Sequence, residues 1–141
     1  MGGRTHTFRY ALIPHAGDWQ QAAVYRDGQA FNNPFLIHKA QLHAGTLPAR
    51  WGLLEISPSN VVLTTVRPGP GQTTMIRVYE ASGRNTPGVK VALHARVTAA
   101  NEANLMEDPG RKLRVQNHTV QFALHPFEIK TIQLQLGEAA K

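Results

Sequence analysis

The chain has 141 residues, of which 42% are hydrophobic and 17% charged, with a net charge of +6 and no cysteine. This length suits one folded domain, or one domain plus an appended piece, and the lack of cysteine excludes a disulfide framework and thiolate metal sites. Basic residues are mostly spread singly, so we expect no nucleic-acid partner. The first residues lack a signal-peptide core and no run could span a bilayer, so we expect a cytoplasmic location and no membrane association.

The first predicted element is a strand over residues 5–13, in which Phe8, Tyr10 and Leu12 alternate with Thr7 and Arg9. Only residues 1–4 precede it, beginning with Met1-Gly2-Gly3. Because a strand needs a neighbour with which to pair, the alternation raises the question of whether an upstream domain supplies that neighbour.

A short helix is expected over Trp19–Arg26, with Asp18 as its N-cap. Gly28 should weaken its end, and the run Asn32-Asn33-Pro34 should stop it. A brief strand is expected over Phe35–His38, and the stretch that follows is irregular.

From Trp51 onward the pattern changes to short runs rich in Val, Ile and Thr, separated by Pro and Gly turns. The predicted strands are 53–56, 60–66, 74–80, 89–97, 112–115, 119–124 and 128–136. Their spacing and alternation predict an all-β protein, an antiparallel β-sandwich with one short helix near the N-terminus. We divide the chain into an N-terminal segment, 1–48, and a C-terminal β-sandwich domain, 49–141.

Two groups of side chains could carry chemistry. His15 and Asp18 place an imidazole near a carboxylate, as in an oriented base or a metal-ligand pair. We favour the alternative that Asp18 caps the helix and His15 binds a loop carbonyl, since no third ligand follows at a recognisable spacing. Glu102, Glu107 and Asp108 could supply the paired carboxylates of a glycosidase, although acids are ordinary in turns. We predict no catalytic, cofactor-binding or metal-ligating residue.

Six stretches, taken together, resemble the late part of family 38 glycoside hydrolases, the α-mannosidases. They follow one another in order from about His6 to Leu136. The stretches are His6–Trp19 with Phe31–Pro34, Asn60–Arg67 leading into Ile76–Gly83, Ala103–Glu107, and Val120–Ile132.

The resemblance implies a long parent enzyme that hydrolyses terminal α-mannosides with retention. An upstream α/β domain would carry zinc and the catalytic carboxylates, and a helical bundle and β-domains would follow it. No residue here matches the zinc-ligand or nucleophile motifs. The resemblance therefore implies a C-terminal β-sandwich that supports the catalytic domain and is inactive alone, with the upstream domains as its partners.

Two further hypotheses stay open beside this one. The sandwich could bind a mannose-containing carbohydrate, with Trp19 and Trp51 as candidate sugar-facing side chains and His15 and Asp18 as polar candidates. It could also be a complete small hydrolase that depends on the acids near Glu102. We expect an exposed apolar surface where upstream domains would pack, and self-association through it. Its candidate residues are Phe8, Tyr10, Leu12, Phe31, Phe35 and Leu36.

Overall fold

The computed structural model describes the chain except for residues 1–2, 4, 47 and 138–141. The chain divides into two compact units, residues 1–34 and residues 35–141, and each is described by itself. The predicted boundary between residues 48 and 49 stays a prediction. No helix in the described part of the chain has the length and apolar character needed to cross a lipid bilayer.

The first unit contains the helix α1 (Val24–Asn32), which begins later than the sequence predicts. The Asp18 carboxylate accepts a hydrogen bond from the Gln21 amide at 2.7 Å and so caps the turn before the helix, but the N-cap of α1 is Ala23, so the prediction that Asp18 caps the helix is wrong. Ala23 has a left-handed backbone with φ 52°, which interrupts the first turn and delays the helix. The helix then continues past Gly28 and ends, as expected, at Asn32.

The predicted strands over residues 5–13 and 35–38 are wrong, because both segments lack strand structure. Phe8, Tyr10 and Leu12 are 84%, 88% and 90% exposed. Alternation supplies an apolar side for a strand, but the strand itself needs a hydrogen-bonded neighbour, and neither segment has one in this structure.

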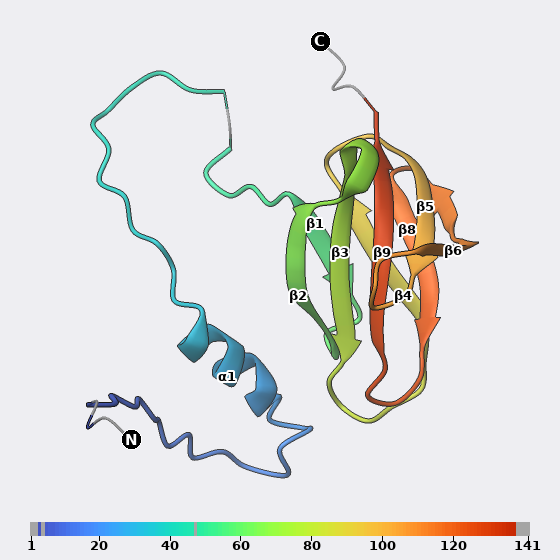
Figure 1. The fold of residues 1–141 in the computed structure, drawn as a ribbon. Coiled ribbons are helices and arrows are strands. Elements are labelled where there is room, and N and C mark those ends of the chain that lie inside the picture. The colour runs from blue at the N-terminus through green and yellow to red at the C-terminus, as the bar shows by residue number, and fades with distance from the viewer. Residues whose placement is uncertain (1–2, 4, 47, 138–141) are drawn as a thin grey trace. The chain divides into compact units, whose positions relative to one another are not determined.

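The second unit is a sandwich of two antiparallel sheets, as predicted (Figure 1). The four-stranded sheet has the order β1 (Leu54–Ser57), β4 (Thr86–Leu93), β8 (Thr119–Leu124), β7 (Arg114–Gln116). The five-stranded sheet has the order β2 (Val61–Pro68), β3 (Thr73–Glu80), β9 (Ile129–Leu136), β5 (Val97–Ala103), β6 (Pro109–Lys112). A short 3-10 turn, η1 (Pro70–Gln72), joins β2 to β3.

Two predicted strands are each divided in the structure. The strand predicted over 89–97 breaks after Leu93, where the chain leaves β4 and crosses to β5 in the other sheet. The strand predicted over 112–115 is divided at Leu113, which packs against the core between β6 and β7. In both places the residue types on either side of the break favour a strand. The sequence pattern therefore does not reveal that the chain passes from one sheet to the other there.

The core lies between the two sheets and is built from alternate residues of the long strands. Ile76, Val78 and Ile132 are completely buried there, as are Val91 and Leu124 from the facing sheet. Alternation along each strand places one set of side chains in the core and the other set on the outer face. All the residues of this core cluster lie between Val61 and Leu134.

Candidate functional site

One buried carboxylate, that of Glu80 at the end of β3, organises one end of the sandwich. Its Oε1 accepts hydrogen bonds from the Asn60 side chain and the Ser82 amide, both at 2.8 Å, and from the Ser82 hydroxyl. Its Oε2 accepts the amides of Gly83 at 2.6 Å, Arg84 at 3.1 Å and Phe127 at 3.1 Å. The carboxylate thus joins three connections between strands.

The pKa of Glu80 reflects this environment. Burial raises the pKa, but the hydrogen bonds from Ser82, Asn60 and the Phe127 amide outweigh burial and lower it to about 2. Glu80 is 0% exposed, and its oxygens are occupied by donors from the chain itself. A carboxylate held ionised and covered in this way suits a structural role rather than proton transfer to a substrate.

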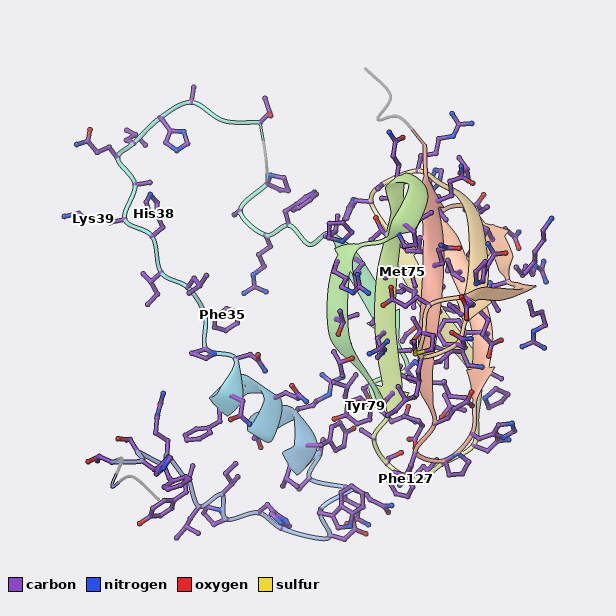
Figure 2. All side chains as sticks on the ribbon, in the orientation of Figure 1. Phe35, His38, Lys39, Met75, Tyr79 and Phe127 are labelled. Carbon is purple, nitrogen blue, oxygen red and sulfur yellow. The ribbon has the colours of Figure 1, made fainter. Side chains whose placement is uncertain are left out.

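The turn after Glu80 and the β8–β9 turn meet closely. Gly83 has φ +70°, and a β-carbon at this position would lie 2.6 Å from Cζ of Phe127. Figure 2 shows Tyr79 and Phe127 at this same end of the sandwich. Glu80 was not among the predicted site residues, although the run Glu80-Ala81-Ser82-Gly83 carries a usable signal: an acid followed by turn residues whose amides can converge on it.

A second cluster of charges surrounds Lys130, which is 6% exposed. Its Nζ lies 2.9 Å from Glu102 Oε1 and 3.0 Å from Glu128 Oε1, and Arg111 also pairs with Glu102 at 3.1 Å. Burial raises the pKa of Glu128, but the hydrogen bond from the His125 amide and the neighbouring Lys130 outweigh it and lower the pKa. Glu102 is therefore held between two cations.

The other two acids of the candidate glycosidase group are bound elsewhere. Glu107 pairs with Arg67 of β2, and Asp108 exchanges hydrogen bonds with Asn104 in the β5–β6 connection. Each of the three carboxylates thus has its own partner, and none is paired with a second carboxylate across an open cleft, as a glycosidase site needs.

The remaining candidate residues lie in separate places. In the first unit, His15 is exposed, Asp18 caps the turn at Gln21, and Trp19 is 42% exposed. In the second unit, Trp51 is 54% exposed and its ring lies 5.6 Å from that of His94. His38 and His43 lie on the exposed segment after Pro34, where Figure 2 shows Phe35, His38 and Lys39 along an extended chain.

An apolar cavity of about 390 Å³ opens at one end of the sandwich. Its apolar lining includes Leu53, Leu54, Val66, Ile76, Leu93 and Leu136. Leu53 and Leu93 are close in sequence to Trp51 and His94, and the His94 amide donates to the Leu53 carbonyl at 3.1 Å. The Trp51–His94 pair therefore lies near this cavity.

The resemblance places the zinc in an upstream domain, and the described part of this chain offers no alternative site for it. Among the residues whose positions the structure gives, no group of three or more His, Asp or Glu side chains could hold a metal ion. The acids closest to forming a cluster are neutralised by lysine and arginine. A zinc site needs three or four ligands that converge on one point.

Comparison with known proteins agrees with the sandwich architecture. Residues 60–132 match the model of the glycosyl hydrolases family 38 C-terminal beta sandwich domain, so the chain belongs to this family. It is similar to alpha-mannosidase 2C1 of Mus musculus, with 31% identity over 93% of the chain, and to its Homo sapiens counterpart, with the same identity and coverage. Alpha-mannosidase G of Dictyostelium discoideum is 26% identical over 92% of the chain.

The matched region is a small part of each relative. The chain spans 13% of the mouse and human proteins and 12% of the Dictyostelium protein. The family resemblance expected from the sequence is confirmed: the chain belongs to the family 38 glycosyl hydrolase C-terminal β-sandwich domains.

Proposed function

We propose that this domain takes no direct part in glycoside cleavage and supports the part of an α-mannosidase that does. The observation that carries the proposal is the amount of exposed apolar surface in the first 50 residues. The relatives share this region, since their alignments cover more than nine-tenths of the chain, far beyond residues 60–132.

The exposed side chains are large and numerous. Phe35, Leu36 and Ile37 are 98%, 99% and 95% exposed. In segment 5–13, Phe8, Tyr10 and Leu12 are also largely exposed. Phe31 differs from the expectation, because it is half-buried and Arg9 lies 5.3 Å from its ring centroid. Side chains of this kind are stable in a folded protein when another surface covers them, and the rest of the enzyme is the surface we propose.

The non-catalytic role is supported by the partners that the acidic side chains already have within the chain. Glu80 is covered by donors, and Glu102 and Glu107 are bound to cations. We propose that the zinc and the catalytic carboxylates of the enzyme lie outside this chain. The absence of cysteine suits a reducing compartment, and we propose a cytosolic location, which imaging of a fluorescently tagged protein would test.

The catalytic part of the proposal is tested on the 141-residue chain itself. We expect no release of nitrophenol from 4-nitrophenyl α-mannoside in the presence of added zinc, above a blank without protein. Turnover close to that of the full-length mouse relative would overturn the proposal.

The supporting role is tested by deleting the matching region from the mouse relative. We expect a lower melting temperature and a lower soluble yield, with an unchanged KM in any enzyme that stays soluble. An unchanged melting temperature together with a raised KM would contradict support and favour a role in binding substrate.

Sugar binding is the second candidate function, and the Trp51–His94 pair is the observation that favours it. Trp51 is half-exposed and lies near the apolar cavity of about 390 Å³. Aromatic faces of this kind can stack on a sugar ring. Titration with mannose and mannobiose, followed by tryptophan fluorescence, should show a saturable change that is lost in Trp51→Ala and retained in Trp19→Ala. No change at millimolar sugar would remove this candidate.

A further inference from the structure

The connection between β5 and β6 lies across the outer face of the five-stranded sheet. Glu107, in this connection, pairs with Arg67 on β2. Two strands, β3 and β9, separate β5 from β2 in the sheet order, so the connection and the two paired side chains together bridge three strand spacings, about 14 Å. Figure 1 shows the connection passing over β9. We call residues Asn104–Asp108 the strap.

Two side chains on the outer face of the five-stranded sheet, those of Met75 and Thr131, are buried. Met75 lies directly opposite Arg67 in the β2–β3 register and next along β3 to Ile76, which faces the core. Met75 therefore points to the outer face, yet it is only 1% exposed, and Thr131 on the same face of β9 is 3% exposed. Figure 2 labels Met75 on this sheet. Gly69 contributes to the burial of Met75, because a β-carbon at position 69 would lie 2.7 Å from Met75 Cγ.

The strap is held in one conformation by its own hydrogen bonds. The Asp108 amide donates to Asn104 Oδ1 at 3.0 Å, and the Asn104 side-chain amide donates to Asp108 Oδ2 at 3.0 Å. Glu107 has φ 73°, a strained value for a residue other than glycine. This ordered loop nonetheless leaves Leu105 69% exposed and Met106 82% exposed.

We propose that Leu105 and Met106 on the strap form a docking contact for the preceding part of the α-mannosidase polypeptide. This inference rests on the proposed function and names a second surface for it, distinct from the exposed N-terminal segment. A rigid loop that presents two apolar side chains is suited to contact another apolar surface, and methionine adapts to an irregular one.

The size of the patch favours this partner over a second copy of the chain. A stable complex of separate proteins buries about 800 Å² per partner, far more than two side chains offer. A domain joined covalently to its partner is held at a high effective concentration, so a small contact suffices there. The relatives supply such a partner, because this chain spans only 13% of the mouse protein.

The test uses the oxidation of methionine by hydrogen peroxide, measured by mass spectrometry on tryptic peptides. Met106 is the only methionine between Arg96 and Arg111, so its oxidation is read from one peptide, and the buried Met75 serves as an internal control. Met106 should oxidise quickly in the 141-residue chain. It should oxidise about tenfold more slowly when the chain is joined to the catalytic part of an α-mannosidase, while Met75 stays slow in both.

Variants provide a second readout. Leu105→Ser with Met106→Ser should shorten the thermal inactivation half-life of the joined enzyme and leave the melting temperature of the isolated chain unchanged. Ile129→Ser, which changes a side chain that is 60% exposed on β9, is the matched control and should have no effect on the half-life.

The outcomes separate this inference from the proposed function. If hydrogen exchange in the N-terminal segment slows on joining but Met106 oxidises at an unchanged rate, the domains have docked without the strap, and this inference fails alone. If joining slows neither hydrogen exchange in the N-terminal segment nor the oxidation of Met106, the proposed function fails as well. Protection of Met106 that rises with the concentration of the isolated chain would assign the strap to a second copy and overturn the inference.

Discussion

At the scale of single residues, Glu80 is the side chain on which most of the local order depends. It accepts hydrogen bonds from Asn60 before β2, from the turn after β3, and from Phe127 in the turn before β9. These donors are buried or half-buried, so each would lose its partner if the carboxylate were removed. The residue therefore links the sequence of one turn to the packing of a whole end of the sandwich.

Replacement of Glu80 by glutamine should destabilise the chain by about 3 kcal/mol, because an amide nitrogen would face backbone donors that a carboxylate oxygen accepts. Urea unfolding followed by circular dichroism measures this loss. Glu55→Gln is the matched control, since Glu55 is exposed on β1, and its effect should stay within about 0.5 kcal/mol. An equal effect of the two changes would contradict the role given to Glu80.

The same residue predicts a pH dependence. The pKa of Glu80 is about 2 in the folded chain, below its ordinary value of 4.5, so the unfolded chain binds more protons between these two values. The stabilisation is fully present above pH 4.5 and is lost as the pH falls towards 2, by up to about 3 kcal/mol. In urea unfolding, the difference in stability between the wild type and Glu80→Gln should shrink between pH 6 and pH 3. A constant difference would count against the assignment.

At the scale of elements, the turn between β3 and β4 depends on one glycine. Gly83→Ala should destabilise the chain by about 1–2 kcal/mol, because the position has φ +70° and its β-carbon would meet the Phe127 ring. Gly88→Ala is the control, since a β-carbon there meets nothing within 4 Å. It should be neutral or slightly stabilising in the same thermal melts. Equal melting temperatures for the two variants would contradict this reading of the turn.

At the scale of the whole molecule, the N-terminal segment and the sandwich contribute differently to stability. Among the described residues from 3 to 50 none is buried, whereas the core cluster begins at Val61. Deletion of residues 1–50 should therefore leave the urea midpoint of the sandwich almost unchanged. Deletion from Ile129 onward, which removes the central strand β9, should abolish cooperative unfolding. A large loss of stability after the N-terminal deletion would show that the segment belongs to the folded core.

The exposed segment after Pro34 also predicts behaviour in solution. Phe35, Leu36 and Ile37 offer nearly all their surface to solvent, so the isolated chain should self-associate at high concentration. Replacing all three by serine should leave a single monomeric species in sedimentation velocity. The control replaces three exposed polar residues of the same segment, His38, Lys39 and Gln41, and should not change the association.

Much of the fold was predictable because apolar and polar residues alternate clearly along the strands of this sandwich. The predicted strand over residues 128–136 agrees with β9 (Ile129–Leu136) to within a residue, since Ile132 and Leu134 face the core and Gln135 faces solvent. The break after Leu93 was not predictable, because residue types favourable to a strand continue to Val97 while the chain changes sheets. The delayed start of α1 depends on the backbone of Ala23, which its residue type does not indicate.

Alternating apolar runs and turn residues were enough to predict a sandwich, and the order of the motifs was enough to indicate family 38. The partners of the acids could be learned only from the folded chain. Glu80, Glu102 and Glu107 look alike in the sequence, but pairing between distant strands places one under amide donors, one between cations and one against Arg67. The alternation of apolar and polar residues along a strand is visible in a short stretch of sequence. The partner of a side chain, in contrast, depends on residues far away along the chain.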